Sequence, residues 1–343
     1  MKILSPDLSF NISKTARALP SGDAVTNLDI FQKFPRTADK SISFQQKMAD
    51  MITQELSFKT RYWVHKPWLS LDLAIENAET LAVNCLKKMS NLSAVDAFVM
   101  GSTTNTRYSG SQATSVLGHF GVTVPAYDFK AGCSTSLAAF SMAYGLMMLG
   151  YERVLVCCSE TMSKIIDPDN EKTWLGVADG AAALLFERAE NGQFCIEQSI
   201  FSTDGRHVDA FTTKGMLPPT ESILSEDGYF LQGDDALLKQ LAQEKYTKML
   251  DALFENEKPD NIRWIIPHQV NRQLIDELIT KYGLEHCELI WDADEVGNIG
   301  GASIAYSLAG AFKKRVFDEK GKILMMSVGG GLTFAAQVVS VTG

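Results

Sequence analysis

Apolar runs of strand length recur along the first half of the chain and alternate with segments of helical periodicity. The apolar runs predict strands at residues 96–101, 122–128, 153–159 and 181–187. The segments between them predict helices at residues 111–117 and 134–149. Strands that alternate with helices indicate parallel sheets covered by helices, which is an α/β architecture.

The second half of the chain shows a similar rhythm. Strands are predicted at residues 263–267, 322–328 and 333–341, and helices at residues 270–282 and 301–314. The repetition indicates a duplicated α/β unit, with an N-terminal half at residues 1–190 and a C-terminal half at 191–343. Two regions fit less well. Residues 20–69 are polar with helical segments, and residues 204–234, rich in Gly, Pro, Thr and Ser, are predicted to form loops over the site.

Composition and charge exclude several classes of protein. The apolar content of 45% is ordinary for a globular chain of 343 residues, and a net charge of −9 argues against a general nucleic-acid binder. No apolar run reaches the roughly 18 residues of a membrane span. The six cysteines form no C-x-x-C pair, and the histidines are too scattered for a zinc pattern. The first ten residues are too polar for a signal peptide, so we expect free thiols, no bound metal and a cytoplasmic protein.

Cys133 is the first candidate for chemistry, because it lies where a strand gives way to a helix. The predicted strand ends near Asp128, and the three hydroxyl residues that follow Cys133 suit a helix start. Free N–H groups and the helix dipole stabilise a thiolate at such a position. A free cysteine is more often a small buried apolar residue, so this context leaves both interpretations open.

Three further segments add candidate groups. His268 follows an apolar strand and a proline, and the carboxyl ends of parallel strands are where ligands gather. Asn298 lies between glycines before a helix, which also fits an ordinary turn. The glycines at 329–331 follow another apolar strand, and such a loop presents backbone N–H groups to a ligand or simply closes a hairpin.

Taken in order, these segments resemble the β-ketoacyl-ACP synthase III (KAS III)-like condensing enzymes of the thiolase superfamily. The segments that carry the resemblance are the cysteine turn, 25–29 (VTNLD), 159–160 (SE), 178–182 (ADGAA), 268–271 (HQVN), 297–298 (GN) and 329–333 (GGGLT). The resemblance implies a thiolase-like fold, in which two α/β halves form a five-layered αβαβα arrangement. It also implies an acyltransferase of the EC 2.3.1 class.

The resemblance assigns a role to each candidate. Cys133 would carry an acyl group taken from a thioester, and His268 and Asn298 would support decarboxylative Claisen condensation with a malonyl thioester. The backbone N–H groups of Cys133 and Gly330 would form the oxyanion hole. Asn271, Gly329, Gly331 and Tyr108 would bind substrate or pantetheine, and Arg272 would dock an acyl carrier protein. The family also implies a homodimer, no cofactor, and a place in fatty-acid or polyketide-type biosynthesis.

The chain departs from the family pattern at the adenine of coenzyme A. A Trp and an Arg usually sandwich the adenine, but residues 51–61 contain no Trp and Glu171 takes the second position, beside Lys172. We therefore expect an acyl carrier protein to deliver the acyl group, or coenzyme A to bind differently.

Three alternatives to this function stay open. The first is transfer of the acyl group to an alcohol or amine. The second is the role of a subunit in a heterodimeric ketosynthase. The third is joining of two acyl chains without decarboxylation, which would need an acidic base near Cys133, and the loop at 103–112 offers none.

Overall fold

The computed structural model describes residues 2–69, 76–255 and 257–342. Ten strands form one hydrogen-bonded sheet that consists of two halves with the same topology. The N-terminal half contains β1 (Leu8–Ala18), β4 (Ala97–Gly101), β5 (Ala126–Phe129), β6 (Arg153–Thr161) and β7 (Asp179–Arg188). The C-terminal half contains β8 (Phe194–Thr203), β11 (Ile262–Pro267), β12 (Glu288–Leu289), β13 (Gly321–Gly329) and β14 (Thr333–Val341).

Each half uses its strands in the same spatial order. The N-terminal half runs β5-β4-β6-β7-β1 and the C-terminal half runs β12-β11-β13-β14-β8. In the N-terminal half, β4 pairs in parallel with β5 and β6, and β7 pairs antiparallel with β6 and β1. In the C-terminal half, β11 pairs in parallel with β12 and β13, and β14 pairs antiparallel with β13 and β8. A short antiparallel pairing of β1 with β8 joins the halves. The predicted division at residues 190–191 lies in the turn between β7 and β8, and its status as a domain boundary stays a prediction.

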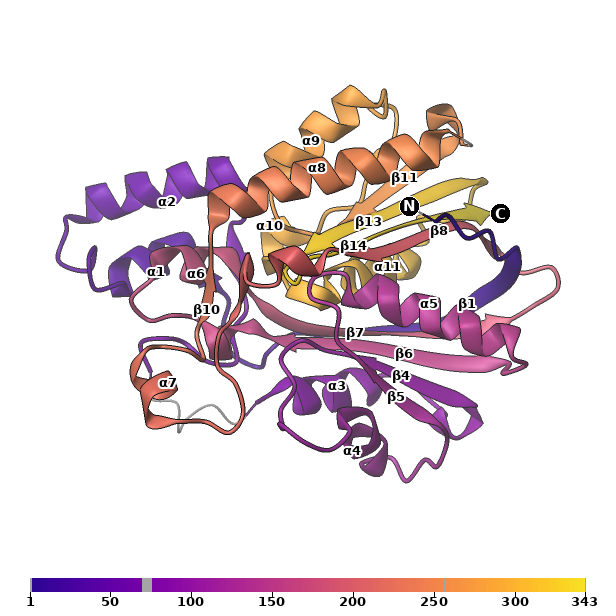
Figure 1. The fold of residues 1–343 in the computed structure, drawn as a ribbon, viewed down its shortest axis with the longest axis horizontal. Coiled ribbons are helices and arrows are strands. Elements are labelled where there is room, and N and C mark those ends of the chain that lie inside the picture. The colour runs from indigo at the N-terminus through magenta and orange to yellow at the C-terminus, as the bar shows by residue number, and fades with distance from the viewer. Residues whose placement is uncertain (1, 70–75, 256, 343) are drawn as a thin grey trace.

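Helices and half-sheets stack into five layers, as the family resemblance implies (Figure 1). α5 (Thr135–Met148) and α11 (Ser303–Lys313) lie between the two half-sheets. α3 (Ala78–Leu86) and α4 (Gln112–Gly118) cover the outer face of the N-terminal half, and α8 (Asp235–Phe254) and α9 (Arg272–Lys281) cover that of the C-terminal half. α5 is buried on most sides because sheets lie on both sides of it, which explains its nearly continuous apolar sequence.

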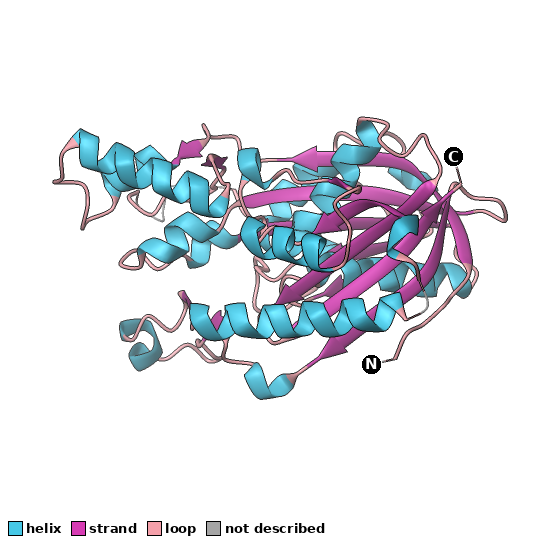
Figure 2. Ribbon diagram, turned by 90° about the horizontal axis from the view of Figure 1, so that it is seen from above, coloured by secondary structure: helices cyan, strands magenta, loops and turns pink. Residues whose placement is uncertain are grey.

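The remaining elements gather at one end of the molecule, and the termini lie toward the other (Figures 1 and 2). The helices there are α1 (Asn27–Lys33), α2 (Ile42–Leu56), α6 (Glu171–Gly176), α7 (Glu221–Ser225) and α10 (Ala293–Val296). Two small ladders pair β2 (Val25–Thr26) with β3 (Thr60–Arg61), and β9 (Phe211–Thr213) with β10 (Leu231–Gly233). None of the helices in the described ranges combines the length and apolar character that crossing a membrane requires.

Several boundaries differ from the expectation. The strand predicted at 122–128 begins only at Ala126, and the helix predicted from 270 begins at Arg272. The first strand of each half, β1 and β8, was not predicted at all. Both strands interleave buried and half-exposed positions, so neither contains the continuous apolar run on which the prediction relied.

Candidate active site

Cys133 lies on a tight turn between β5 and α5, the helix start that the sequence predicts. Gly132 has φ +53°, a conformation that glycine adopts without strain. The hydroxyl of Thr135 closes the turn, because it donates to the Gly132 carbonyl at 2.7 Å and accepts from the Ala131 N–H at 3.0 Å. Cys133 therefore sits immediately before the first turn of a buried central helix.

The thiol of Cys133 is protonated at rest, contrary to the thiolate expected at a helix start. Burial raises the pKa of Cys133 to about 12, and the nearby carboxylate of Glu160 adds to the rise. The backbone N–H groups of Gly330 and of Cys133 itself act in the opposite direction and favour the thiolate. These are the two donors predicted for the oxyanion hole, so both face the region where negative charge would form.

The glycine loop that follows β13 packs directly against the cysteine turn. A Cβ atom at Gly329 would overlap the backbone of Cys133, and a Cβ at Gly132 would overlap the Gly330 carbonyl. The hydroxyl of Thr333 donates to the Ala131 carbonyl at 2.7 Å and ties the two segments together. The loop is also the hairpin turn between β13 and β14. The glycines therefore serve both to close the hairpin and to let the loop backbone approach Cys133 closely.

His268 is completely buried at the carboxyl end of β11. Its backbone N–H donates to the Met326 carbonyl at 2.8 Å, and its Nδ1 lies 2.8 Å from the Ser303 hydroxyl. Its Nε2 has no hydrogen-bond partner among the described residues. Burial lowers the pKa of His268 to about 4, so the imidazole is neutral at physiological pH.

Asn298 follows Gly297, whose φ is +74°, and lies on the loop between α10 and α11. Its backbone carbonyl accepts from the Ala178 N–H at 2.7 Å, and its side-chain Oδ1 accepts from the Gly300 N–H at 2.9 Å. The first bond holds the backbone, and the second fixes the side-chain amide. Its Nδ2 makes no hydrogen bond to any residue that the structure describes, which leaves this donor available to a ligand.

Two cavities meet at Cys133. The first, about 340 Å³, is lined by Cys133, His268, Asn298, Gly329 and Gly330 together with apolar side chains. The second, about 270 Å³, also contains Cys133 and Gly330 on its wall and extends to Gly331. The structure thus brings the three predicted catalytic side chains and all three loop glycines to one connected site.

Comparison with known proteins agrees with this geometry. Two family profiles match, "3-Oxoacyl-[acyl-carrier-protein (ACP)] synthase III" over residues 127–205 and its C-terminal counterpart over residues 254–341. The 3-oxoacyl-[acyl-carrier-protein] synthase III structure from Aquifex aeolicus superposes with a TM-score of 0.80 at 23% identity, over 96% of this chain and 99% of that one. The β-ketoacyl-[acyl-carrier-protein] synthase III of Rhodospirillum centenum is 30% identical over 252 residues, which cover 71% of this chain and 76% of that protein.

The chain belongs to the β-ketoacyl-[acyl-carrier-protein] synthase III family. It is accordingly a KAS III-like ketosynthase and an acyltransferase. The fold is shared more widely. The priming β-ketosynthase of the R1128 polyketide pathway superposes with a TM-score of 0.81 at 19% identity, over 98% of both chains.

Other site residues predicted from the KAS III resemblance lie off the cavity walls. Asn271 caps α9, since its Oδ1 accepts from the Leu274 N–H at 3.0 Å, which is the ordinary alternative for this residue. Arg272 pairs with Asp276 at 2.8 Å. Tyr108 is 73% exposed and lines neither cavity. Their roles in binding substrate and docking a carrier stay predictions.

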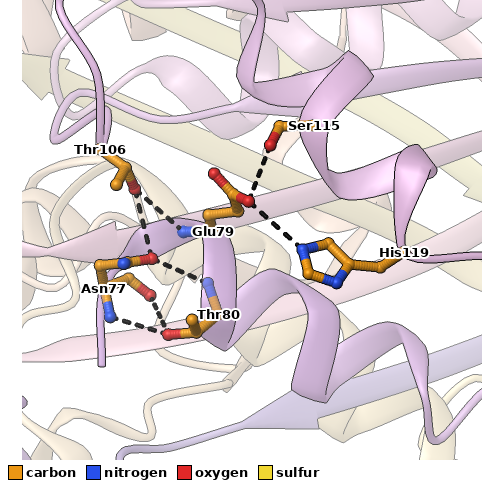
Figure 3. Close-up of polar contacts among 6 residues, drawn as sticks. All are labelled: Asn77, Glu79, Thr80, Thr106, Ser115 and His119. Atoms are coloured by element: carbon orange, nitrogen blue, oxygen red, sulfur yellow. Dashed lines mark hydrogen bonds and ion pairs between the residues drawn. The ribbon is translucent and has the colours of Figure 1, made fainter. Parts of the chain in front are cut away.

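The loop that carries Tyr108 is anchored by a polar cluster at the start of α3 (Figure 3). The Thr106 hydroxyl accepts from the backbone N–H of Glu79 at 3.3 Å and lies 3.3 Å from Asn77 Oδ1. The Glu79 carboxylate accepts from Ser115 at 2.7 Å and meets His119 at 3.3 Å. This cluster fixes the base of the loop and leaves its tip, at Tyr108, exposed to solvent.

A buried acid, Glu160 of the 159–160 (SE) segment, lies near Cys133, although its sequence predicted no place beside the thiol. Glu160, on β6, has no exposed surface. Its carboxylate accepts hydrogen bonds from the backbone N–H and hydroxyl groups of Thr103 and Thr104, at 2.7–3.1 Å. Burial raises the pKa of Glu160, and these bonds oppose the rise. The sequence signal for this acid was its position, because Glu160 directly follows the apolar run of β6.

Trp63, which follows residues 51–61 in the chain, is a core residue. Trp63 is 3% exposed, and its indole N–H donates to the Val177 carbonyl at 2.8 Å. It packs in an aromatic cluster with Trp68, Trp174 and Phe34. Trp63 is therefore part of the core and is unavailable to a nucleotide at the surface. Lys172 lines the larger cavity.

Proposed function

We propose that this chain condenses an acyl group held on Cys133 with a malonyl thioester and releases carbon dioxide. The observation that supports this most strongly is the arrangement around the larger cavity. A neutral, buried His268 with an unpartnered Nε2 and an Asn298 amide with an unpartnered Nδ2 line the same cavity as the thiol. Two hydrogen-bond donors beside a nucleophile suit an intermediate that carries negative charge on oxygen.

In the first step, the sulfur of Cys133 attacks the carbonyl carbon of an acyl thioester. The carbonyl oxygen becomes an oxyanion, which accepts hydrogen bonds from the backbone N–H groups of Cys133 and Gly330. The carbon–sulfur bond to the carrier then breaks, and the thiol proton of Cys133 leaves with the carrier thiolate. Because the thiol is protonated at rest, these two N–H groups must stabilise charge that appears only during the reaction.

In the second step, a malonyl thioester occupies the larger cavity and loses its carboxylate as carbon dioxide. The electron pair of the broken carbon–carbon bond forms an enolate, whose oxygen accepts from His268 Nε2 and Asn298 Nδ2. The enolate carbon attacks the acyl carbonyl on Cys133, and the bond to sulfur breaks to release the 3-oxoacyl product. The Cys133 thiolate that remains takes up a proton from solvent, which restores the resting thiol. Each such donor contributes about 3–4 kcal/mol to transition-state stabilisation.

We assign the two cavities to the two ends of the acyl thioester. The larger cavity would hold the phosphopantetheine arm, with Gly329 beside it, and the smaller would hold the acyl chain, with Gly331 on its wall. Because these residues are glycines, the backbone of the loop lies close to the Cys133 sulfur at the point where the two cavities meet.

We propose an acyl carrier protein as the partner that delivers both thioesters. The family takes its name from such carriers. The buried Trp63 and the acidic Glu171 offer no adenine clamp, which favours a protein carrier over free coenzyme A. Arg272 remains the candidate docking cation, although Asp276 already pairs with it.

We further propose a cytoplasmic homodimer. The six thiols are all free. β5 is the terminal strand of its half-sheet, and the exposed tip at Tyr108 would reach the acyl pocket of the partner subunit. An unchanged chain-length preference in Tyr108→Ala would count against this role for the loop.

The assay for this function uses a panel of acyl-carrier-protein thioesters with labelled malonyl-carrier protein. We expect wild-type protein to form 3-oxoacyl product and release carbon dioxide in equal amounts. Cys133→Ala should form no product, and Asn298→Asp should acylate Cys133 but lose most of the carbon dioxide release. Acylation of Cys133 followed by transfer to an alcohol or amine, with no carbon dioxide, would replace condensation with acyl transfer.

A further inference from the structure

Two serines one helical turn apart on α11 form hydrogen bonds with the side chains of His268 and Gln269. The Ser303 hydroxyl lies 2.8 Å from His268 Nδ1, and the Gln269 side-chain N–H donates to the Ser307 hydroxyl at 2.9 Å. Both serines are 0% exposed. Residues i and i+4 share one face of a helix, so α11 presents the two hydroxyls side by side to the end of β11.

The position of the imidazole proton decides what His268 can do. A neutral imidazole carries one proton, either on Nδ1 or on Nε2. A proton on Nε2 makes this atom a hydrogen-bond donor toward the cavity. A proton on Nδ1 would leave a lone pair on Nε2, which would repel an enolate oxygen and instead accept a proton from a substrate.

Hydrogen-bond satisfaction distinguishes the two forms, although a distance of 2.8 Å fits both. Among the residues that the structure describes, His268 Nδ1 is the sole hydrogen-bond partner of the Ser303 hydroxyl. If Nδ1 carried the proton, the hydroxyl hydrogen of Ser303 would be buried without an acceptor. If the hydroxyl donates to Nδ1, both groups are satisfied, and satisfied buried groups are strongly favoured.

We propose that Ser303 is a positioning residue that donates to Nδ1 of His268 and so keeps the imidazole proton on Nε2. The catalytic meaning of this inference rests on the proposed function, in which Nε2–H donates to the enolate oxygen. The inference also accounts for the unpartnered Nε2: the donor is held ready, and its acceptor is the substrate. Ser303 itself lines neither cavity and acts only through His268.

The test compares Ser303→Ala with Ser307→Ala, its matched control one turn along the same helix. Each variant removes one buried, hydrogen-bonded hydroxyl, but only Ser303→Ala touches His268. The tautomer is read by ¹⁵N NMR of protein labelled in its five histidines, with His268 assigned from the signal lost in His268→Gln. Thermal unfolding confirms that both serine variants are folded.

We expect wild type and Ser307→Ala to carry the proton on Nε2, and Ser303→Ala to shift the tautomer toward Nδ1. Decarboxylation of malonyl-carrier protein should fall about 10- to 100-fold in Ser303→Ala, by analogy with the cost of removing the partner that orients a metal-binding histidine. Acylation of Cys133 and both activities of Ser307→Ala should be unchanged. These results together would support the role of Ser303.

A wild-type His268 protonated on Nδ1, or a Ser303→Ala variant that keeps both the Nε2 proton and the decarboxylation rate, would overturn the inference. A failure of the proposed function can be distinguished from a failure of this inference. If wild type released no carbon dioxide but its Nε2 proton still depended on Ser303, condensation would be wrong and the positioning role would stand.

Discussion

The backbones of Gly329 and Cys133 are in such close contact that no side chain fits between them. This contact brings the Gly330 N–H to the sulfur and thereby builds half of the proposed oxyanion hole. It joins the carboxyl end of a strand in the C-terminal half of the protein to the cysteine turn of the N-terminal half. The site therefore depends on how the two halves pack.

Gly329→Ala should disable acyl transfer. The added methyl group would overlap the Cys133 backbone, so the loop must shift and move the Gly330 N–H out of place. The loss of one oxyanion donor lowers the rate by about 10²–10³. Acylation of Cys133, followed by mass spectrometry, measures the effect. Gly145→Ala, in α5 where a Cβ meets nothing within 4 Å, is the control, and it should keep its activity and gain up to about 1 kcal/mol in stability. Equal acylation rates in the two variants would contradict the account.

Glu160→Gln should make Cys133 more acidic. The carboxylate of Glu160 raises the pKa of the Cys133 thiol through its charge, so its removal favours the thiolate and lowers that pKa. Alkylation of Cys133 by iodoacetamide should therefore reach half its maximal rate at a lower pH than in wild type. Glu187→Gln, a half-buried partner of Arg153 on β7, should leave the profile unchanged. An unshifted profile in Glu160→Gln would show that this carboxylate does not act on the sulfur.

His268 should weaken the folded protein at acidic pH. Its folded pKa of about 4 lies below the value of about 6.5 in an unfolded chain. The unfolded state therefore binds a proton first, and stability falls as the pH drops from about 6.5 to 4, by about 3 kcal/mol. Urea unfolding at pH 7 and pH 4 should show a smaller loss for His268→Gln than for wild type. The same loss in both proteins would mean that the buried imidazole does not carry this pH dependence.

The missing adenine clamp predicts a preference for the protein carrier. Acyl-carrier protein should acylate Cys133 faster than the matching acyl-CoA, because Glu171 would repel the coenzyme phosphates and Trp63 is buried. Glu171→Arg should narrow the difference by raising the rate with acyl-CoA. Wild-type acylation by acyl-CoA as fast as by acyl-carrier protein would refute the carrier preference.

Much of the site could be predicted because its residues follow the ends of strands. β5 and β11 each pair in parallel with a neighbouring strand, and Cys133 and His268 come just beyond their carboxyl ends, where ligands gather. Asn298 was identifiable only through its order among the other segments. The five-layered fold followed from the same resemblance, while β1 and β8 were missed because their pattern is interrupted.

The electrostatics of the site could not be predicted from local sequence. The helix start at Cys133 favours a thiolate, but burial and the carboxylate of Glu160 outweigh that effect. Both effects come from segments that are distant in the chain. The glycine loop at 329–331 buries the Cys133 sulfur, and β6 places the carboxylate of Glu160 near it. The orientation of His268 depends likewise on Ser303, 35 residues away.

A single-turnover experiment tests the central claim most directly. Wild-type protein is first acylated on Cys133, and malonyl-carrier protein is then added while acyl-Cys133, carbon dioxide and 3-oxoacyl product are followed together. We predict that the three change at the same rate and in equal amounts, and that acyl-Cys133 persists in Asn298→Asp. Loss of the acyl group from Cys133 without carbon dioxide release would contradict condensation at this site.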